Sequence, residues 1–169
     1  MNRHAPADDA ARPSNRRERV LVALGSNLGD RAASLAHARA RLDAHHACRV
    51  VAATVPEETT PVGPADQPTY LNQMIALRTA LSPLALLELL QEIELEAGRV
   101  RRERWGPRTL DCDIVAFGSR VIRHERLLVP HPELPNRDFW QRELATLDAT
   151  LGDTPHEEDA VQDHGERTA

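Results

Sequence analysis

Hydrophobic and polar residues follow two different periods along the middle of the chain. Short apolar runs that end at glycine or at polar residues predict strands over residues 19–24, 50–55, 71–81 and 110–117, with a further short strand near Val121. Apolar residues at helical spacing, Leu35, Ala38 and Leu42, predict a helix up to about Ala44 with Asp30 as its N-cap.

A second helix is predicted from Ser82 to Ala97. Ser82 is a good N-cap, Pro83 suits the first helical position, and Gly98 suits the end. The prolines within residues 57–69 indicate a stiff loop, residues 99–108 form a charged loop, residues 130–135 form another loop, and residues 136–149 form a final helix.

The predicted order is β-α-β-β-α-β with extra C-terminal elements, which is the ferredoxin-like arrangement of an α+β protein. We therefore expect a mainly antiparallel sheet with helices packed on one face. Residues 1–18 lack apolar periodicity and predict a disordered lead, and residues 152–169 predict a disordered acidic tail. A single domain then covers residues 19–151.

Composition excludes several classes of protein. The 169 residues carry a net charge of −5, which disfavours a nucleic-acid partner, and no apolar stretch is long enough for a membrane span. All 21 basic residues are arginine, so a phosphate loop that depends on lysine is excluded. Cys48 and Cys112 lie far apart and are expected to be reduced thiols in the cytoplasm.

Asp111 and Asp113 are two apart in a predicted strand, so their side chains share one face, while Cys112 and Ile114 point to the core. Paired carboxylates suit Mg²⁺ held together with substrate phosphates. A solvated strand face remains the alternative for this pair taken alone.

Five arginines precede the aspartates within one loop, and this cluster has two possible interpretations. They form either a salt-bridged surface or a phosphate clamp, because arginine binds phosphate in a bidentate manner. The members are Arg99, Arg101, Arg102, Arg104 and Arg108.

Aromatic residues make up only 3% of the chain, so those in polar loops stand out. Tyr70 and Trp105 either cover the core or form a stacking platform for a flat heterocycle.

The run RWGPRTLDCDI, residues 104–114, closely resembles the signature of the 6-hydroxymethyl-7,8-dihydropterin pyrophosphokinase family of folate biosynthesis. Other pieces resemble that family in the same order, over about residues 19–140. They are LGSN from Leu24, TPVGPADQPTYLN from Thr60, ELEAGRVR from Glu94, ERLLVPH from Glu125 and NRDF from Asn136. After Phe139, many relatives continue with an apolar run and a Pro-Leu pair, whereas this chain reads WQREL.

The resemblance implies a role for each matching residue. The pterin is expected to stack between Tyr70 and Phe139, with its polar edge read by Asn72 and by the loop around Thr59, Thr60 and Val62. Asp111 and Asp113 are expected to hold two Mg²⁺ ions that bridge the phosphates of ATP. The residues implied for the nucleotide or phosphate region are Gln91, Glu94, Arg99, Arg101, Trp105, Arg108, Ile114, Arg126, His131 and Arg137.

The implied reaction is attack of the pterin's primary alcohol on the β-phosphorus of ATP, which releases AMP. Arg99 and Arg108 are expected to stabilise transition-state charge from a closing loop, together with the aspartate pair. The implied partners are two small molecules, with no nucleic acid and no membrane, and the implied state is a monomer. A catalytically degenerate pterin-binding paralogue is the alternative, and a structural or interaction protein without a small ligand is a weaker one.

Overall fold

The computed structural model describes residues 9–12, 16–61, 66–98 and 109–152. Within them the chain order is β1 (Glu18–Ser26), α1 (Arg31–Ala44), β2 (Cys48–Ala53), β3 (Glu57–Thr59), β4 (Tyr70–Thr79), α2 (Pro83–Glu96), β5 (Asp111–Phe117), β6 (Ile122–His124), β7 (Leu127–Val129), η1 (Leu134–Asn136) and α3 (Asp138–Gly152). No helix among these residues is both long and apolar enough to cross a lipid bilayer.

The main sheet has the strand order β2-β4-β1-β5, and β3 pairs with the beginning of β4. All of these neighbours are antiparallel, and the long central strands β1 and β4 pair from Glu18–Thr79 to Ser26–Leu71. The elements β1-α1-β2-β4-α2-β5 therefore give the predicted ferredoxin-like βαββαβ core, and the α+β prediction is confirmed.

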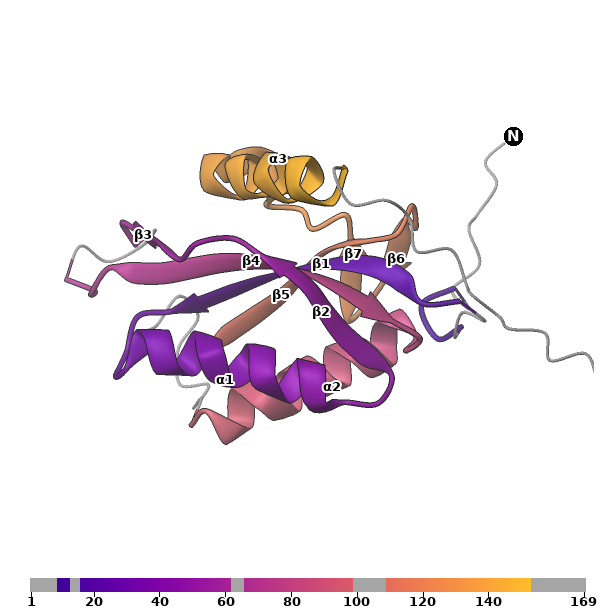
Figure 1. Cartoon of the computed structure of the whole chain (residues 1–169), viewed down its shortest axis with the longest axis horizontal. Coiled ribbons are helices and arrows are strands. Elements are labelled where there is room, and N and C mark those ends of the chain that lie inside the picture. The colour runs from indigo at the N-terminus through magenta and orange to yellow at the C-terminus, as the bar shows by residue number, and fades with distance from the viewer. Residues whose placement is uncertain (1–8, 13–15, 62–65, 99–108, 153–169) are drawn as a thin grey trace, which may run out of the picture.

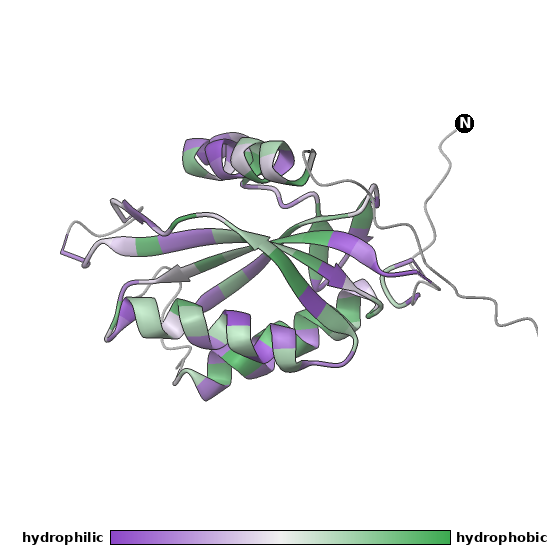
Figure 2. Ribbon diagram, viewed as in Figure 1, coloured by the Kyte–Doolittle hydropathy of each residue, from purple (hydrophilic) through white to green (hydrophobic). Residues whose placement is uncertain are grey.

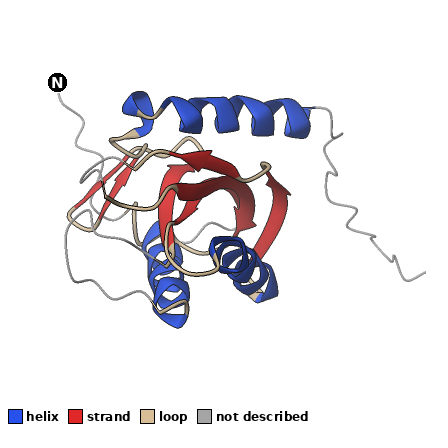
Figure 3. Cartoon of the chain, turned by 90° about the vertical axis from the view of Figure 1, so that its left-hand side faces the viewer, coloured by secondary structure: helices blue, strands red, loops and turns tan. Residues whose placement is uncertain are grey.

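Helices cover both faces of this sheet (Figures 1 and 3). α1 and α2 lie on one face, over a core that contains Val22, Leu24, Ile75 and Ile114. α3 lies on the opposite face, over a second apolar cluster that includes Trp140. The expectation that the helices share one face is therefore wrong for α3.

The physical reason lies in the strands themselves. Central strands buried on both sides read as continuous apolar runs rather than alternating ones. Leu21, Met74 and Val115 are buried on the face opposite α1 and α2, so an extra helix is needed to cover them. Figure 2 shows hydrophobic residues along the strands of the sheet between the two helical layers.

Helix boundaries follow the sequence closely. Asp30 Oδ1 accepts a hydrogen bond from the backbone N–H of Ala33 at 3.0 Å, and Ser82 Oγ accepts one from Ala85 at 3.2 Å. Gly98, which follows α2, has a φ of 81°, a conformation that disfavours side chains with a Cβ. Both predicted caps and the predicted end of α2 are confirmed.

Two loop predictions are wrong in part. Residues 57–59, expected in a stiff loop, form β3, because their backbone lies alongside the extended start of β4. The single short strand expected near Val121 is a hairpin of β6 and β7, with Ile122 opposite Val129. Neither pairing has a side-chain pattern long enough to predict it. Residues 134–136, within the loop expected at 130–135, form the single turn η1.

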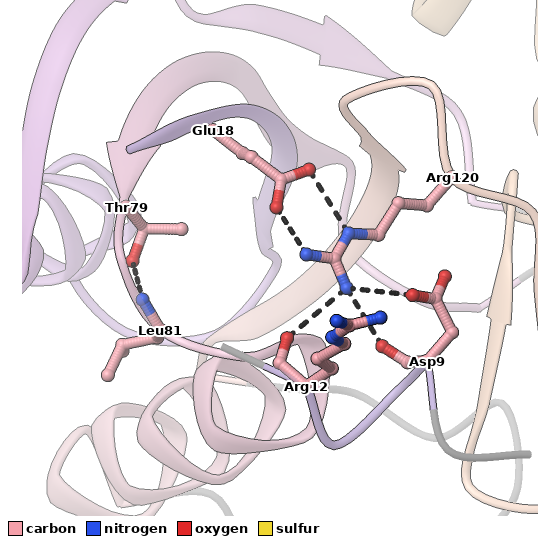
Figure 4. A network of polar contacts seen from close by, with 6 residues as sticks. All are labelled: Asp9, Arg12, Glu18, Thr79, Leu81 and Arg120. Carbon is pink, nitrogen blue, oxygen red and sulfur yellow. Dashed lines mark hydrogen bonds and ion pairs between the residues drawn. The ribbon is translucent and has the colours of Figure 1, made fainter. Parts of the chain in front are cut away.

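The expected disordered lead is also wrong in part, because residues 9–12 dock on the domain (Figure 4). Ala10 is buried in the core, and its carbonyl accepts a hydrogen bond from Leu84 N–H at 3.0 Å. Arg120 Nη1 donates to the carbonyl of Asp9 at 2.8 Å, while its other nitrogens bind the carboxylate of Glu18. A partly buried arginine with carbonyl and carboxylate partners thus orders a segment that lacks apolar periodicity. The acidic tail, apart from Gly152 at the end of α3, lies outside the described residues.

Candidate active site

A cleft opens where β1 ends, β4 and β5 begin, and the first turn of α3 covers the sheet. It encloses about 690 Å³, part of which is open to solvent. Its lining contains Thr59, Thr60, Tyr70, Asn72, Asp111, Asp113, Arg137 and Phe139, together with Ala23, Leu24, Gly25 and Trp140.

The carboxylate pair forms one wall of the cleft. Asp111 and Asp113 lie opposite Gly25 and Ala23 of β1 and are both partly exposed to the cleft. The intervening Cys112 is buried on the other face of the sheet, as the period of two predicts. The two aspartates are therefore neighbours on one side of the strand, and both reach the same space.

Glu94 holds this wall in place from behind. Its side chain is buried, and its Oε1 accepts a hydrogen bond from the backbone N–H of Cys112 at 2.8 Å. The bond joins α2 to β5 between the two aspartates. The structure thus gives Glu94 a supporting contact, and the nucleotide contact implied for it stays a prediction.

His131 lies beside the carboxylate wall, with its Nε2 3.8 Å from Asp113 Oδ1. Burial lowers the pKa of His131, and the nearby Arg137 lowers this pKa further. Its Nδ1 accepts a hydrogen bond from Glu133 N–H at 3.1 Å, so the proton of the neutral ring is on Nε2. The imidazole therefore presents a neutral N–H donor on the side of Asp113.

The opposite part of the cleft carries the aromatic and amide groups. Tyr70 begins β4 and Phe139 begins α3, so the cleft takes one ring from each of two elements. Asn72 Nδ2 donates a hydrogen bond to Thr59 Oγ1, which fixes the orientation of the amide. These side chains suit a flat heterocycle with a polar edge.

Gly25 allows β1 to pass close to these groups. A Cβ at this position would lie 3.2 Å from Asn72 Oδ1 and 3.7 Å from the Tyr70 ring. A side chain at this position would therefore contact the ring and push the amide away by a few tenths of an ångström.

Sequence reasoning did not assign a site role to Trp140. The residue is buried, lines the cleft, and lies edge-on to His131 with ring centroids 5.1 Å apart. The guanidinium of Arg137 sits over its ring at 4.3 Å, a cation–π contact that directs Arg137 toward the cleft. The sequence offered one signal for this role, because Trp140 directly follows Phe139 at the start of the predicted final helix.

Only some of the residues predicted to bind the nucleotide lie at the cleft. Arg137 lines the cleft, and His131 is beside it. Four others do not line it: Gln91, Glu94, Ile114 and Arg126. Val62, Arg99, Arg101, Trp105 and Arg108 lie outside the described residues.

Two of these four nevertheless share one surface. Arg126 Nη1 is 3.2 Å from Glu88 on α2, and Gln91 is three residues further along the same helix face. The side chain of Ile114 is buried in the core on the α1 and α2 side of the sheet, so it does not face the cleft. Its backbone pairs with Val22.

Comparisons with known proteins agree on one family. The family model of 7,8-dihydro-6-hydroxymethylpterin-pyrophosphokinase matches residues 21–149. The 2-amino-4-hydroxy-6-hydroxymethyldihydropteridine pyrophosphokinase of Bacillus subtilis is 44% identical over 144 residues, 82% of this chain and 86% of the relative. The protein of the same name from Pseudomonas aeruginosa is 46% identical over 141 residues, 82% and 87% of the two chains.

A shorter match has higher identity. The Pseudomonas putida protein of that name is 50% identical over 113 residues, which is 67% of this chain and 93% of the relative. The match of the family model spans every described residue of the cleft, from Ala23 to Trp140. The resemblance seen in the sequence is thus confirmed, and the chain belongs to the 7,8-dihydro-6-hydroxymethylpterin-pyrophosphokinase family.

Proposed function

We propose that this cleft is the active site for transfer of pyrophosphate from ATP to the hydroxymethyl group of 6-hydroxymethyl-7,8-dihydropterin. The products are the pterin diphosphate and AMP, in a step of folate biosynthesis. One observation carries the proposal: two aromatic rings, an oriented amide and a pair of carboxylates line the same cleft. The first three suit a pterin, and the carboxylates suit the reacting phosphates.

The pterin end of the site consists of Tyr70, Phe139 and Asn72. The two rings bury the faces of the heterocycle, and the amide pairs with its polar edge. Thr59 and Thr60 line this end of the cleft, and the sequence motif assigns Val62 to it as well. A pterin bound in this way directs its hydroxymethyl group toward the aspartates.

Asp111 and Asp113 fit Mg²⁺, because they offer hard oxygen donors on one wall of the cleft. Among the described residues no group of three or more His, Cys, Asp or Glu side chains could hold a metal ion. Asp111 and Asp113 would therefore hold two Mg²⁺ ions only together with the substrate phosphates, and the ions would offset phosphate charge and make the pterin alcohol more acidic. Through these ions the two carboxylates would position the phosphates next to the alcohol.

The remaining polar groups act on the phosphates. His131 donates a neutral Nε2–H without adding charge, and Arg137 supplies positive charge at the cleft. Arg99, Arg101 and Arg108 are assigned to the phosphates and Trp105 to the nucleotide base by the sequence motif. Gln91 and Arg126, on the surface next to α2, bind the distal part of the nucleotide together with Glu94 and the backbone of Ile114.

We further propose that the protein works as a cytoplasmic monomer on two small molecules, without a nucleic-acid or membrane partner. The buried residues Cys48 and Cys112 form no disulfide, which is compatible with a reducing compartment.

The direct experiment measures AMP formation from ATP and Mg²⁺ with and without the pterin alcohol. We expect AMP and the pterin diphosphate in equal amounts, and only when both substrates are present. Tight binding of the pterin with no AMP would identify the catalytically degenerate paralogue instead. An Asp111→Asn and Asp113→Asn double variant serves as the blank, because it removes both charges and retains the size of the side chains.

A further inference from the structure

Glu143 is a buried acid that the proposed reaction does not use. It lies in α3, is 4% exposed, and stands between Trp140 and Leu147, two members of the apolar cluster beneath this helix. Only one other acidic residue of the described chain, Glu94, is buried to this extent. Burying a carboxylate is costly, so its protonation state matters for how α3 docks.

The hydrogen-bond donors and acceptors around Glu143 favour its neutral, protonated form. Thr54 Oγ1 lies 3.2 Å from Glu143 Oε1 and 3.3 Å from the carbonyl of Met74, and it accepts a hydrogen bond from Met74 N–H at 3.0 Å. Glu143 Oε2 is buried and has no hydrogen-bond partner. A hydroxyl has one proton and two lone pairs.

If Glu143 is ionised, Thr54 donates its only proton to Oε1, and the charged Oε2 is left without a donor. If Glu143 is neutral, its own proton goes to Thr54 Oγ1 and the Thr54 proton goes to Met74. The unpartnered oxygen is then an uncharged carbonyl oxygen, which is much less costly to bury.

The charges around Glu143 do not reverse this preference. Glu57 of β3 disfavours a second negative charge nearby, and Arg142 of α3 favours it. Arg142 is already paired with Glu57 at 2.6 Å. The segment after β2 and the strand β4 supply only the Thr54 hydroxyl and the backbone of Met74. Burial, the largest cause, raises the pKa of Glu143 to about 7.

Glu143 is also placed to act on the cleft. It lies one helical turn after Phe139 and three residues after Trp140, on the same side of α3. Both aromatic residues line the cleft, so a change in the docking of α3 moves one wall of the pterin site.

We propose that Glu143 is a positioning residue that holds the aromatic wall of the pterin site on the sheet as a neutral acid, and that its ionisation loosens this wall. The inference rests on the assignment of the cleft to the pterin. The geometry predicts a larger effect on the pterin than on ATP: the wall that moves carries Phe139, which faces the pterin directly, whereas the phosphate-binding groups Arg137 and His131 contact this wall only through Trp140.

The experiment compares the full-length wild type with Glu143→Gln, whose neutral amide can still donate to Thr54. Asp148→Asn is the matched control, because Asp148 is an exposed carboxylate on the same helix, and the variant removes its charge and its surface ion pair with Arg19 but leaves the buried acid in place. Amide exchange of α3 and the KM values of both substrates are measured at pH 6 and pH 8. The titration of ATP and of the groups that all three proteins share affects each protein equally, so it cancels when the proteins are compared with one another at the same pH.

Between pH 6 and pH 8, the equilibrium constant for opening of α3 should rise about tenfold more in the wild type than in Glu143→Gln. This factor follows from a pKa of about 7 for Glu143 in the closed state. The KM for the pterin should rise severalfold more than that of Glu143→Gln, with a smaller change in the KM for ATP. Asp148→Asn should behave like the wild type. If Glu143→Gln fails to fold, Glu143→Leu replaces it with the same expectations.

Two results would overturn the proposal. Equal pH dependence of α3 exchange in wild type and Glu143→Gln would show that Glu143 does not control docking. The second result is that the pH dependence of α3 exchange differs between the two proteins, but the ratio of their KM values for the pterin is the same at pH 6 and pH 8. It would show that the docking of α3 does not position the wall of the cleft. A wrong pterin assignment is detected separately, because Asn72→Ala would then leave the pterin KM at pH 6 unchanged.

Discussion

At the scale of single residues, the aspartate pair of β5 provides a test of the reaction. Asp111 and Asp113 are partly exposed in the cleft and contribute little to the core. Either change to Asn should therefore lower kcat/KM by about 10²–10³ while the protein stays folded, because a group that acts on transition-state charge is lost. Steady-state kinetics at several Mg²⁺ concentrations, with circular dichroism, measure both effects.

Asp148→Asn is the control for this pair, since it removes the same charge from an exposed position on α3. It should keep wild-type kinetics. Wild-type turnover by Asp111→Asn or Asp113→Asn at saturating Mg²⁺ would contradict the assignment of the carboxylates.

Asn72 separates the two substrates. Asn72→Ala should raise the KM for the pterin about 10–100-fold and leave the KM for ATP nearly unchanged, because a polar edge of the heterocycle loses its partner. Thr59→Val, which removes the hydroxyl that orients Asn72 but keeps the amide, should raise the same KM by a smaller factor. An equal rise of both KM values in Asn72→Ala would count against the pterin assignment.

At the scale of elements, the sequence predicts what local chemistry determines. The caps at Asp30 and Ser82 and the order of the core strands are confirmed, because side-chain pattern and capping are local properties. β3 and the docking of residues 9–12 depend on partners distant in the chain, Asn72 and Arg120, so no local pattern indicates them.

The N-terminal clamp gives a prediction at this scale. Arg120 is 13% exposed in its side chain, and its loss would leave Glu18 and the carbonyl of Asp9 without their partner. Arg120→Ala should lower the free energy of unfolding by about 1–3 kcal/mol, measured in urea. Its kinetics should stay near wild type, because Glu18 and Gly25 are at opposite ends of β1.

Arg126→Ala is the comparison for stability. Its ion pair with Glu88 is exposed on both sides and should contribute only about 0–1 kcal/mol. A loss for Arg120→Ala no larger than that for Arg126→Ala would show that residues 9–12 add nothing to the stability of the domain.

At the scale of the whole molecule, the site was easier to predict than the layers around it. Eight of the residues expected from the motifs meet in one cleft, since the motifs lie at strand and helix ends that this topology brings together. The second helical layer was missed, although it supplies Phe139 and Trp140 to the cleft. Apolar strands indicate burial but not which helix provides it.

This second layer should make the stability of the molecule depend on pH. The pKa of Glu143 is about 7 in the folded protein, against an ordinary value of 4.5 for the unfolded chain. Because the folded value is the higher one, its favourable neutral state is fully present below pH 4.5. The unfolded chain ionises first as the pH rises, so stability falls until the pH passes about 7 and then levels off.

Glu143→Gln removes this dependence, because its side chain stays neutral at every pH. Relative to the wild type, its free energy of unfolding should gain about 2–3 kcal/mol between pH 5 and pH 8. Urea unfolding of both proteins across this range, with Asp148→Asn as the control for exposed charge, measures the difference. The wild type and Glu143→Gln would change in parallel if Glu143 were already ionised at pH 5, and the unpartnered Oε2 would then have to be solvated by water. A difference that instead grows up to about pH 7 and then stays constant identifies a single buried acid as its source.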